Sequence, residues 1–220
     1  MSQFTQEQAA ILADAAQYVQ DEMRHDSTGH DWTHAERVVR LARTIAAEEQ
    51  ADPFRCELAA LLHDIADAKL NPSEAIGLAK VRRWLESRSV PADDAEAVLE
   101  IISTLSFKGG NSPAMKTVEG KVVQDADRLD AIGAIGIARV FVYSGAKGRP
   151  IHDPSLAPRT SMTEAEYRSG RDTAINHFHE KLLKLKDRMN TDYGRRLAEG
   201  RHQVMLRYLA EFDAEWNGER

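Results

Sequence analysis

The chain has 220 residues, 42% of them hydrophobic and 29% charged, which is ordinary for a globular protein and excludes a disordered or fibrous one. Folding hides about 70% of the surface of a chain this long, so a core forms without covalent cross-links. The net charge of −6 argues against a general polyanion binder, and the single cysteine, Cys56, excludes an internal disulfide and favours a reducing compartment.

No segment of the sequence has the pattern needed for export or membrane insertion. The N-terminal MSQFTQEQAA lacks the basic region and apolar core of a secretory signal. The longest apolar stretch, near residues 131–138, is far too short to span a bilayer. The sequence therefore predicts a cytoplasmic protein that binds neither membranes nor, stably, nucleic acid.

Apolar residues recur at helical spacing through most of the chain. Thr33 and Glu36 match a capping box, which places His34 in the first turn of a helix. The second half of a later helix, residues 131–143, is apolar nearly all round and is expected to be the central, fully packed element. The expected helices cover residues 34–49, 54–66, 73–88, 92–105, 118–143, 163–189 and 194–216.

Strands are not expected, because no alternation of period two runs for more than four residues. Loops are expected at residues 108–112 and 144–158, and the second is long enough to suggest a functional role. The prediction is an all-α, single-domain helical bundle over residues 1–220. Its metal-binding core covers about residues 25–145, and C-terminal helices over 160–216 pack on that core.

Four segments carry residue types that are suited to catalysis. GHDWTH (29–34) and LLHDIAD (61–67) place histidine and aspartate at helix ends. QDADRLD (124–130) sets three carboxylates in an otherwise apolar helix, and TLSFKGGN (104–111) holds a lysine in a glycine-rich loop. Each has an ordinary structural interpretation as a cap, a solvated charge or a turn.

The carboxylates of the third segment favour a metal site over that ordinary interpretation. Asp127 and Asp130 share one face of the expected helix, and burying an unpaired carboxylate is expensive. Arg128 points away from that face, so a bound cation is the better partner. Two imidazoles and two carboxylates suit divalent Mn, Fe, Ni, Zn or Mg, and they come from His34, His63, Asp64 and one of Asp125, Asp127 and Asp130.

The order His … His-Asp … Asp resembles the HD-domain superfamily of metal-dependent phosphohydrolases, most closely its small bacterial YedJ-like branch. The resemblance covers most of the chain, through GHDWTHAERV, ALLHDI, LSFKGG, DADRLDAIGAIGIAR and INHFHEKLLKLKDRMNT. It implies that His34, His63, Asp64 and Asp127 are the metal ligands. Asp127 matches the final aspartate of the family because a basic and then an apolar residue follow it.

The resemblance also implies a reaction, the hydrolysis of a nucleotide phosphate ester or anhydride by attack of a metal-bound water on phosphorus. The leading expectation is conversion of a nucleoside triphosphate to the monophosphate and pyrophosphate. The alternatives are a nucleoside monophosphate phosphatase and a non-catalytic nucleotide-sensing domain. One divalent ion per chain is expected, because no histidine lies between Asp64 and Asp127 to complete a second site.

Three further residues are candidates for contact with the substrate. Asp67 occupies the place where related nucleotidases often have a glutamate for proton transfer, but its shorter side chain suits an outer-shell role equally well. Lys108, beside two glycines, can reach a phosphate or can be an ordinary turn residue. Arg159 flanks the long loop and is a second cation for the substrate.

Overall fold

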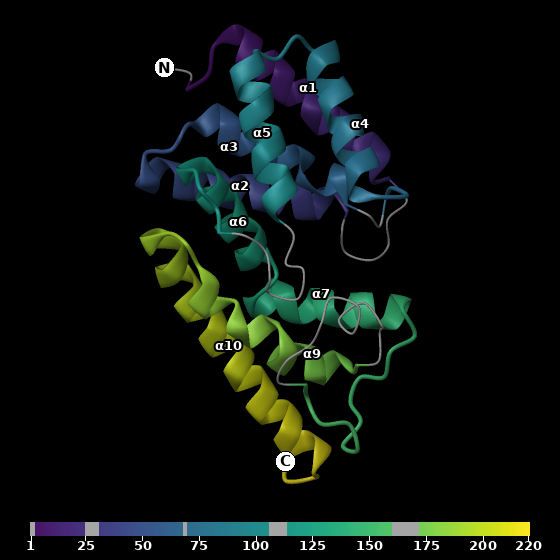
Figure 1. The fold of residues 1–220 in the computed structure, drawn as a ribbon. Coiled ribbons are helices and arrows are strands. Elements are labelled where there is room, and N and C mark those ends of the chain that lie inside the picture. Colours follow the sequence, from purple (N-terminus) through teal and green to yellow (C-terminus); the bar gives the residue numbers. More distant parts are fainter. Residues whose placement is uncertain (1–2, 25–30, 68–69, 106–113, 160–171) are drawn as a thin grey trace. The chain divides into compact units, whose positions relative to one another are not determined.

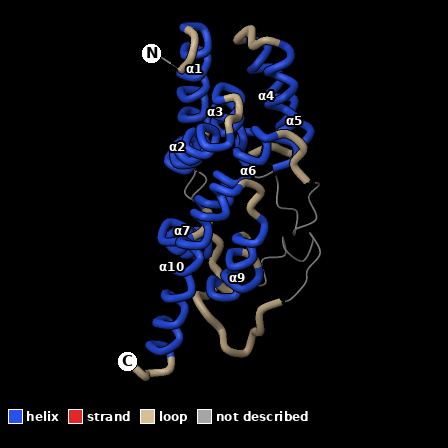
Figure 2. Tube along the Cα trace, turned by 90° about the vertical axis from the view of Figure 1, so that its left-hand side faces the viewer, coloured by secondary structure: helices blue, strands red, loops and turns tan. Residues whose placement is uncertain are grey.

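The computed structural model describes residues 3–24, 31–67, 70–105, 114–159 and 172–220. Within these ranges every regular element is a helix (Figure 1), and Figure 2 shows helices joined by loops with no strand among them. The all-α prediction is confirmed. The chain forms two compact units, one reaching Asp127 and one running onward from Arg128. The division into a core of about 25–145 and packed C-terminal helices stays a prediction.

The first unit is built around one central helix, α3. It packs on α1, α2 and α5 and is buried on nearly every side. Its Leu58 and Leu62 are fully buried, which contributes about 1.5–3 kcal/mol each. The unit comprises α1 (Gln6–Glu22), α2 (Trp32–Glu49), α3 (Pro53–Leu62), the 3₁₀ turn η1 (His63–Ala66), α4 (Glu74–Ser87), α5 (Ala92–Leu105) and the part of α6 (Val118–Asp130) up to Asp127. The helices expected over 73–88 and 92–105 are confirmed as α4 and α5.

The start of α2 differs from the expected capping box. The Asp31 carboxylate accepts the backbone amide of His34 at 2.9 Å, so the helix begins at Trp32. The Thr33 hydroxyl donates to the same carboxylate at 2.7 Å. The predicted cap by Thr33 and Glu36 is therefore wrong, because an ionised aspartate is a stronger acceptor for the free amides of a first turn.

The single helix expected over residues 118–143 is also wrong. The chain breaks after Asp130 into α6 and a separate helix α7 (Gly133–Ala146). Gly133 has a φ of +76°, a conformation that favours glycine, and a Cβ there would lie 2.9 Å from the Cβ of Arg201. Hydrophobic periodicity does not report a positive φ, so the pattern read through the bend.

The apolar helix α7 is not the fully packed element that its sequence suggests. Its Ile135 and Val142 are 43% and 53% exposed, whereas Gly136 and Val140 are buried. Small residues thus form part of the packed face, and two branched residues face outward. No described helix alone is long and apolar enough to cross a membrane, and α6 and α7 meet that test only as a bent pair.

The second unit alternates helices with tight turns. After α7 come α9 (Ala174–Glu180), the 3₁₀ turns Leu182–Lys184 and Lys186–Arg188, and α10 (Asp192–Trp216). The expected helix over 194–216 is confirmed, with a start two residues earlier where Thr191 caps it. The expected helix over 163–189 is wrong from Lys181 onward, and its residues 163–171 lie outside the described ranges. Leu182 and Leu185 are buried three residues apart, which matches the period of a 3₁₀ turn.

Ion pairs anchor the long loop of the second unit. Residues 147–159 contain no helix, whereas the expected loop began three residues earlier, within α7. Arg149 pairs with the buried carboxylate of Asp172 at 2.9 Å, and Arg159 pairs with the buried carboxylate of Glu180 at 2.6 Å. The loop is thereby tied to α9 and its N-terminal flank.

Candidate metal centre

The first histidine of the site is fixed by the start of α2. His34 is the third residue of that helix and is only 1% exposed. The Asp31 carboxylate holds its backbone amide. Burial raises the pKa of Asp31, but the hydrogen bonds from Thr33 and His34 outweigh this effect, so the pKa lies below its usual range. The cap therefore stays ionised at neutral pH.

The His-Asp pair lies on a short 3₁₀ turn. α3 ends at Leu62, and His63–Ala66 continues as η1, so the single helix expected over 54–66 is wrong in its last turn. The Nδ1 atom of His63 lies 2.7 Å from the carbonyl oxygen of Ala60. A ring nitrogen that donates to a backbone carbonyl leaves Nε2 as the lone-pair donor, which is the usual arrangement of a metal-binding histidine.

Four side chains of the first unit converge on one point. The Nε2 atoms of His34 and His63 lie 3.3 Å apart. The two oxygens of Asp64 lie 3.4 Å from Nε2 of His34 and 3.5 Å from Nε2 of His63. Asp127 approaches the same two atoms to 3.5 Å and 3.9 Å. The structure thus brings together the four residues predicted as metal ligands, His34, His63, Asp64 and Asp127, which we call the metal group.

The chemistry of this donor set fits a divalent ion. One atom from each of His34, His63 and Asp127 lies within 4.8 Å of the others. Two imidazole nitrogens that face each other beside two carboxylates form a site where a positive charge is strongly favoured. The Asp127 side chain is 36% exposed, so the group is open on one side, as a catalytic site requires.

The other two aspartates of α6 lie outside this group. Asp130 is 1% exposed and pairs with Arg139 at 2.6 Å, so a guanidinium from α7 balances its charge. Asp125 is fully buried. The sequence left the choice among the three carboxylates open until the family resemblance was used, because the partner Arg139 lies beyond an unforeseen bend.

The three candidate substrate residues are not gathered in the same way. Asp67 caps the end of η1, and its amide donates to the Asp64 carbonyl at 3.1 Å. Lys108 lies outside the described residues. Arg159 is engaged by Glu180 through both Nε and Nη2, at 2.9 Å and 2.6 Å. The roles proposed for these three residues stay predictions.

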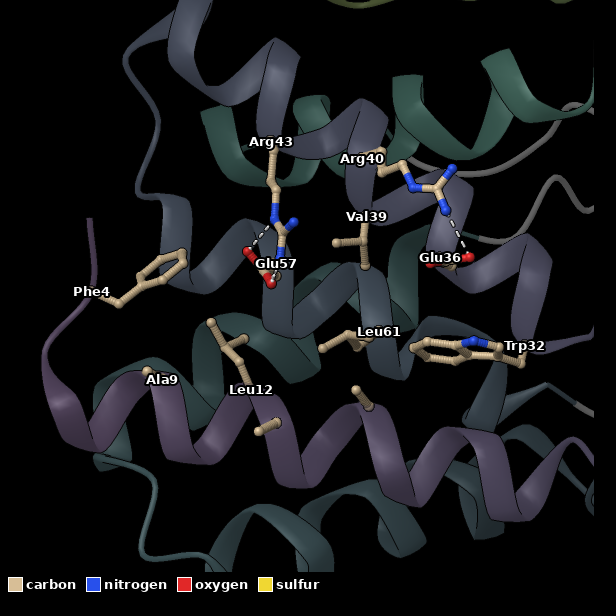
Figure 3. Close-up of a pocket in the computed structure, with 12 residues that line it drawn as sticks. Phe4, Ala9, Leu12, Trp32, Glu36, Val39, Arg40, Arg43, Glu57 and Leu61 are labelled. Carbon is tan, nitrogen blue, oxygen red and sulfur yellow. Dashed lines mark hydrogen bonds and ion pairs between the residues drawn. The ribbon is translucent and has the colours of Figure 1, made fainter. Parts of the chain in front are cut away.

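A pocket of about 400 Å³ lies elsewhere in the first unit (Figure 3). Its walls come from α1, α2 and α3, with Leu12, Val39 and Leu61 among its apolar residues. Arg43 lies beside it and pairs with the buried Glu57. None of the four residues of the metal group lines this pocket. We place the candidate functional site at the metal group, because its side chains are suited to binding a metal ion, whereas the pocket has no such set of side chains.

Sequence reasoning missed two side chains that support the site, Asp31 and Asn71. Asp31 carried a usable signal, because an aspartate directly before a helix is a typical cap. Asn71 donates to the carbonyl oxygens of Ile65 and Asp67 at 2.8 Å and 2.9 Å. Its only signal was an asparagine before a proline in a turn.

Known proteins resemble this chain over nearly its whole length. Residues 31–132 match the family model of the HD domain. YpgQ of Bacillus subtilis, an uncharacterized protein, is 40% identical over 203 residues, which cover 91% of each chain. Its crystal structure in complex with ADP has a TM-score of 0.75 and 40% identity, over 93% of this chain and 97% of that one.

Two other solved structures resemble it to a similar degree. A Lactobacillus plantarum protein has a TM-score of 0.86 and 45% identity, over 95% of this chain and 98% of that one. An HD-superfamily hydrolase from Bacillus thuringiensis has a TM-score of 0.75 and 43% identity, over 96% and 98%. Likeness of this extent settles the family to which the chain belongs.

Proposed function

We propose that this chain, which belongs to the HD-domain family and is a metal-dependent phosphohydrolase, cleaves nucleoside triphosphates to the monophosphate and pyrophosphate. The observation that carries the proposal is the convergence of His34, His63, Asp64 and Asp127 within the matched residues 31–132. The ADP bound to YpgQ, a protein 40% identical to this one, supports a nucleotide as the substrate.

The residues of the first unit divide the work of such a reaction. The chemistry that a divalent ion would supply when bound is activation of a water and neutralisation of phosphoryl charge. His34 and His63 would hold the ion through Nε2, while the carbonyl of Ala60 orients the ring of His63. Asp64 and Asp127 supply the negative charge that selects a cation.

The outer residues are assigned roles in the same scheme. Asp67 follows the His-Asp turn directly and is proposed to pass a proton to the leaving group or to orient a water. Lys108 and Arg159 are proposed to bind phosphate oxygens. The proposal also includes the YedJ-like branch, one ion per chain, a cytoplasmic location and no nucleic-acid or membrane partner.

The deciding experiment separates the two possible products. The protein is stripped of metal and reloaded singly with Mn, Mg, Fe, Ni or Zn. It is then supplied with nucleoside tri-, di- and monophosphates, while phosphate and pyrophosphate are measured separately. Pyrophosphate from triphosphates is the expected result. Phosphate from monophosphates alone would show a 5′-nucleotidase instead, and binding without turnover would show a sensor.

Metal content tests the expected stoichiometry. Metal analysis after desalting should give about one ion per chain for the substrate-free protein. Two-metal sites hold ions about 3.5–4 Å apart and need ligands beyond the four that converge here. Two tightly held ions per chain, both needed for activity, would contradict the one-metal scheme.

A further inference from the structure

Two of the four residues in the metal group sit on a short and intrinsically weak element. His63 and Asp64 open η1, which runs for only four residues. A 3₁₀ turn has poorer hydrogen-bond geometry than an α-helix and is seldom stable on its own. Contacts from outside the turn must therefore hold the two side chains at their angle.

The Asn71 side chain provides one such contact. Its Nδ2 donates to the carbonyl oxygen of Ile65 at 2.8 Å and to that of Asp67 at 2.9 Å, so both amide hydrogens are used. Ile65 lies within the turn and is 1% exposed, and Asp67 is the residue that ends it. One side chain thus joins the inside of the turn to its end.

The backbone of α4 provides a second contact. Gly77 lies so close to Ala66, the last residue of η1, that a Cβ on the glycine would come within 2.4 Å of the Ala66 carbonyl oxygen. The turn therefore rests against α4, and Asn71 fixes the carbonyls on either side of Ala66. Little freedom remains for His63 and Asp64 to rotate away from His34.

From these contacts we infer that Asn71 is a positioning residue, which orients His63 and Asp64 for metal binding through the turn that carries them. It also orients the backbone of Asp67, the candidate proton donor. The inference rests on the proposed function, because it assigns Asn71 a role in that reaction. Asn71 has a place in the outer shell of the site, where substitutions typically cost about 10–100-fold in metal affinity or activity.

The test first measures the affinity for Co²⁺ with no other ligand present, and then measures the turnover of the nucleoside triphosphate. Asn71→Ala removes both donated hydrogen bonds, and Asn71→Asp removes them while keeping the shape of the side chain. The matched control is Asn176→Ala, which removes an asparagine amide bonded to the Leu156 carbonyl at 2.8 Å in the second unit. Circular dichroism establishes that each variant is folded.

Both Asn71 variants are expected to bind Co²⁺ about 10–100-fold more weakly than the wild type and to change its visible absorption spectrum. kcat should fall more than KM rises. Asn176→Ala should lower the melting temperature while keeping the wild-type Co²⁺ affinity and spectrum. A folded Asn71→Asp that matches Asn176→Ala in affinity and spectrum would overturn the role of Asn71 and leave the proposed function standing. Wild-type protein that binds no Co²⁺ would overturn both.

Discussion

The second unit and the metal group of the first unit differ in where their carboxylates find a positive charge. In the second unit the chain supplies it, since three buried carboxylates are each met by an arginine. These pairs are Asp130 with Arg139, Asp172 with Arg149, and Glu180 with Arg159. Glu57 of the first unit is met in the same way by Arg43. At the metal group, by contrast, Asp64 and Asp127 face two imidazoles.

This difference identifies a structural carboxylate and a ligand carboxylate by their neighbours. A guanidinium is always charged, so the pair that it forms is complete without a further partner. Imidazole nitrogens are common metal ligands, and two of them beside two carboxylates are suited to holding a metal ion rather than to replacing one.

The largest effect is expected at the metal group. His63→Ala or Asp64→Ala should abolish metal binding and hydrolysis, because each removes a ligand from a set of four. Helical content should change little, since neither side chain is part of the apolar core. Isothermal titration with metal, an activity assay and circular dichroism check the three statements.

His179→Ala is the control for that experiment. His179 is an exposed histidine of α9 in the second unit. Its replacement should leave metal affinity and turnover at wild-type values. Near-normal turnover in His63→Ala or Asp64→Ala would refute the ligand assignment.

The second effect concerns a structural carboxylate. Arg159→Ala leaves Glu180, whose side chain is 3% exposed, without its guanidinium partner, and the loss of stability should be about 3 kcal/mol. Burial raises the pKa of Glu180, but the bonds from Arg159 hold it below its usual range. Without Arg159 this pKa should rise, so the folded state takes up a proton more readily and the loss of stability should be smaller at pH 5 than at pH 7. Urea unfolding at pH 7 and pH 5 measures both effects.

The matched control is a similar arginine–glutamate pair at the surface. Arg82 contacts Glu96 through two nitrogens, but the side chains are 48% and 62% exposed. Arg82→Ala should therefore cost far less stability than Arg159→Ala. A raised KM in folded Arg159→Ala would support a substrate role, whereas an unchanged kcat/KM would make Arg159 purely structural.

The parts of the structure that the sequence could predict are those with strong local signals. α4 and α5 follow from apolar spacing and clear end signals, because Ser73 caps the first and Pro91 precedes the second. The four residues that converge in the first unit could be picked out from the sequence, because they are chemically distinctive and appear in a known order; their role as metal ligands stays a prediction. Only the resemblance to the HD-domain family selected Asp127, since local spacing does not distinguish the three aspartates of α6.

What the sequence could not predict depends on contacts between distant residues. The bend after α6 needs the positive φ of Gly133 and the nearness of Arg201, which are 68 positions apart. The 3₁₀ turns after α9 could not be told from a helix, because buried leucines at a spacing of three fit the period of either structure. The pairing of Arg159 with Glu180 could not be predicted from the sequence either, because the sequence does not show which acidic residue lies beside Arg159.

A third effect tests close backbone packing behind the metal group. Gly77→Ala places a methyl group 2.4 Å from the Ala66 carbonyl oxygen, so backbone atoms must move. Stability should fall by about 1–3 kcal/mol, and metal affinity should fall as well, because Ala66 shares its turn with His63. Thermal unfolding and metal titration measure the two effects.

Gly200→Ala is the control for packing. Gly200 lies within α10 and has nothing within 4 Å of its ideal Cβ position. Alanine there should stabilise the protein by up to about 1 kcal/mol through its greater helix propensity, with no change in metal affinity. Equal effects of the two alanines would mean that α4 does not hold the turn in place.

The smallest effect is a pH dependence in the second unit, centred on His177. Burial lowers the pKa of His177, and Lys181 and Arg149 lower it further, against the opposing effect of Asp172, whose Oδ2 is 3.8 Å from Nδ1 of His177. The unfolded chain, with an ordinary histidine pKa of about 6.5, therefore binds more protons than the folded chain below that pH. Stability should be fully present above pH 6.5 and should decline as the pH falls toward 5.

His177→Gln should flatten this decline, because glutamine binds no proton in either state. The urea midpoint measured from pH 5 to pH 7.5 gives the slope for each variant. The exposed His179 is the matched control, since its replacement by glutamine should leave the wild-type slope unchanged. Equal slopes in wild type and His177→Gln would mean that the pH dependence arises from other groups. A flattened slope would show that the second unit, whose carboxylates are met by arginines, is sensitive to acid chiefly through His177, whose side chain is 18% exposed.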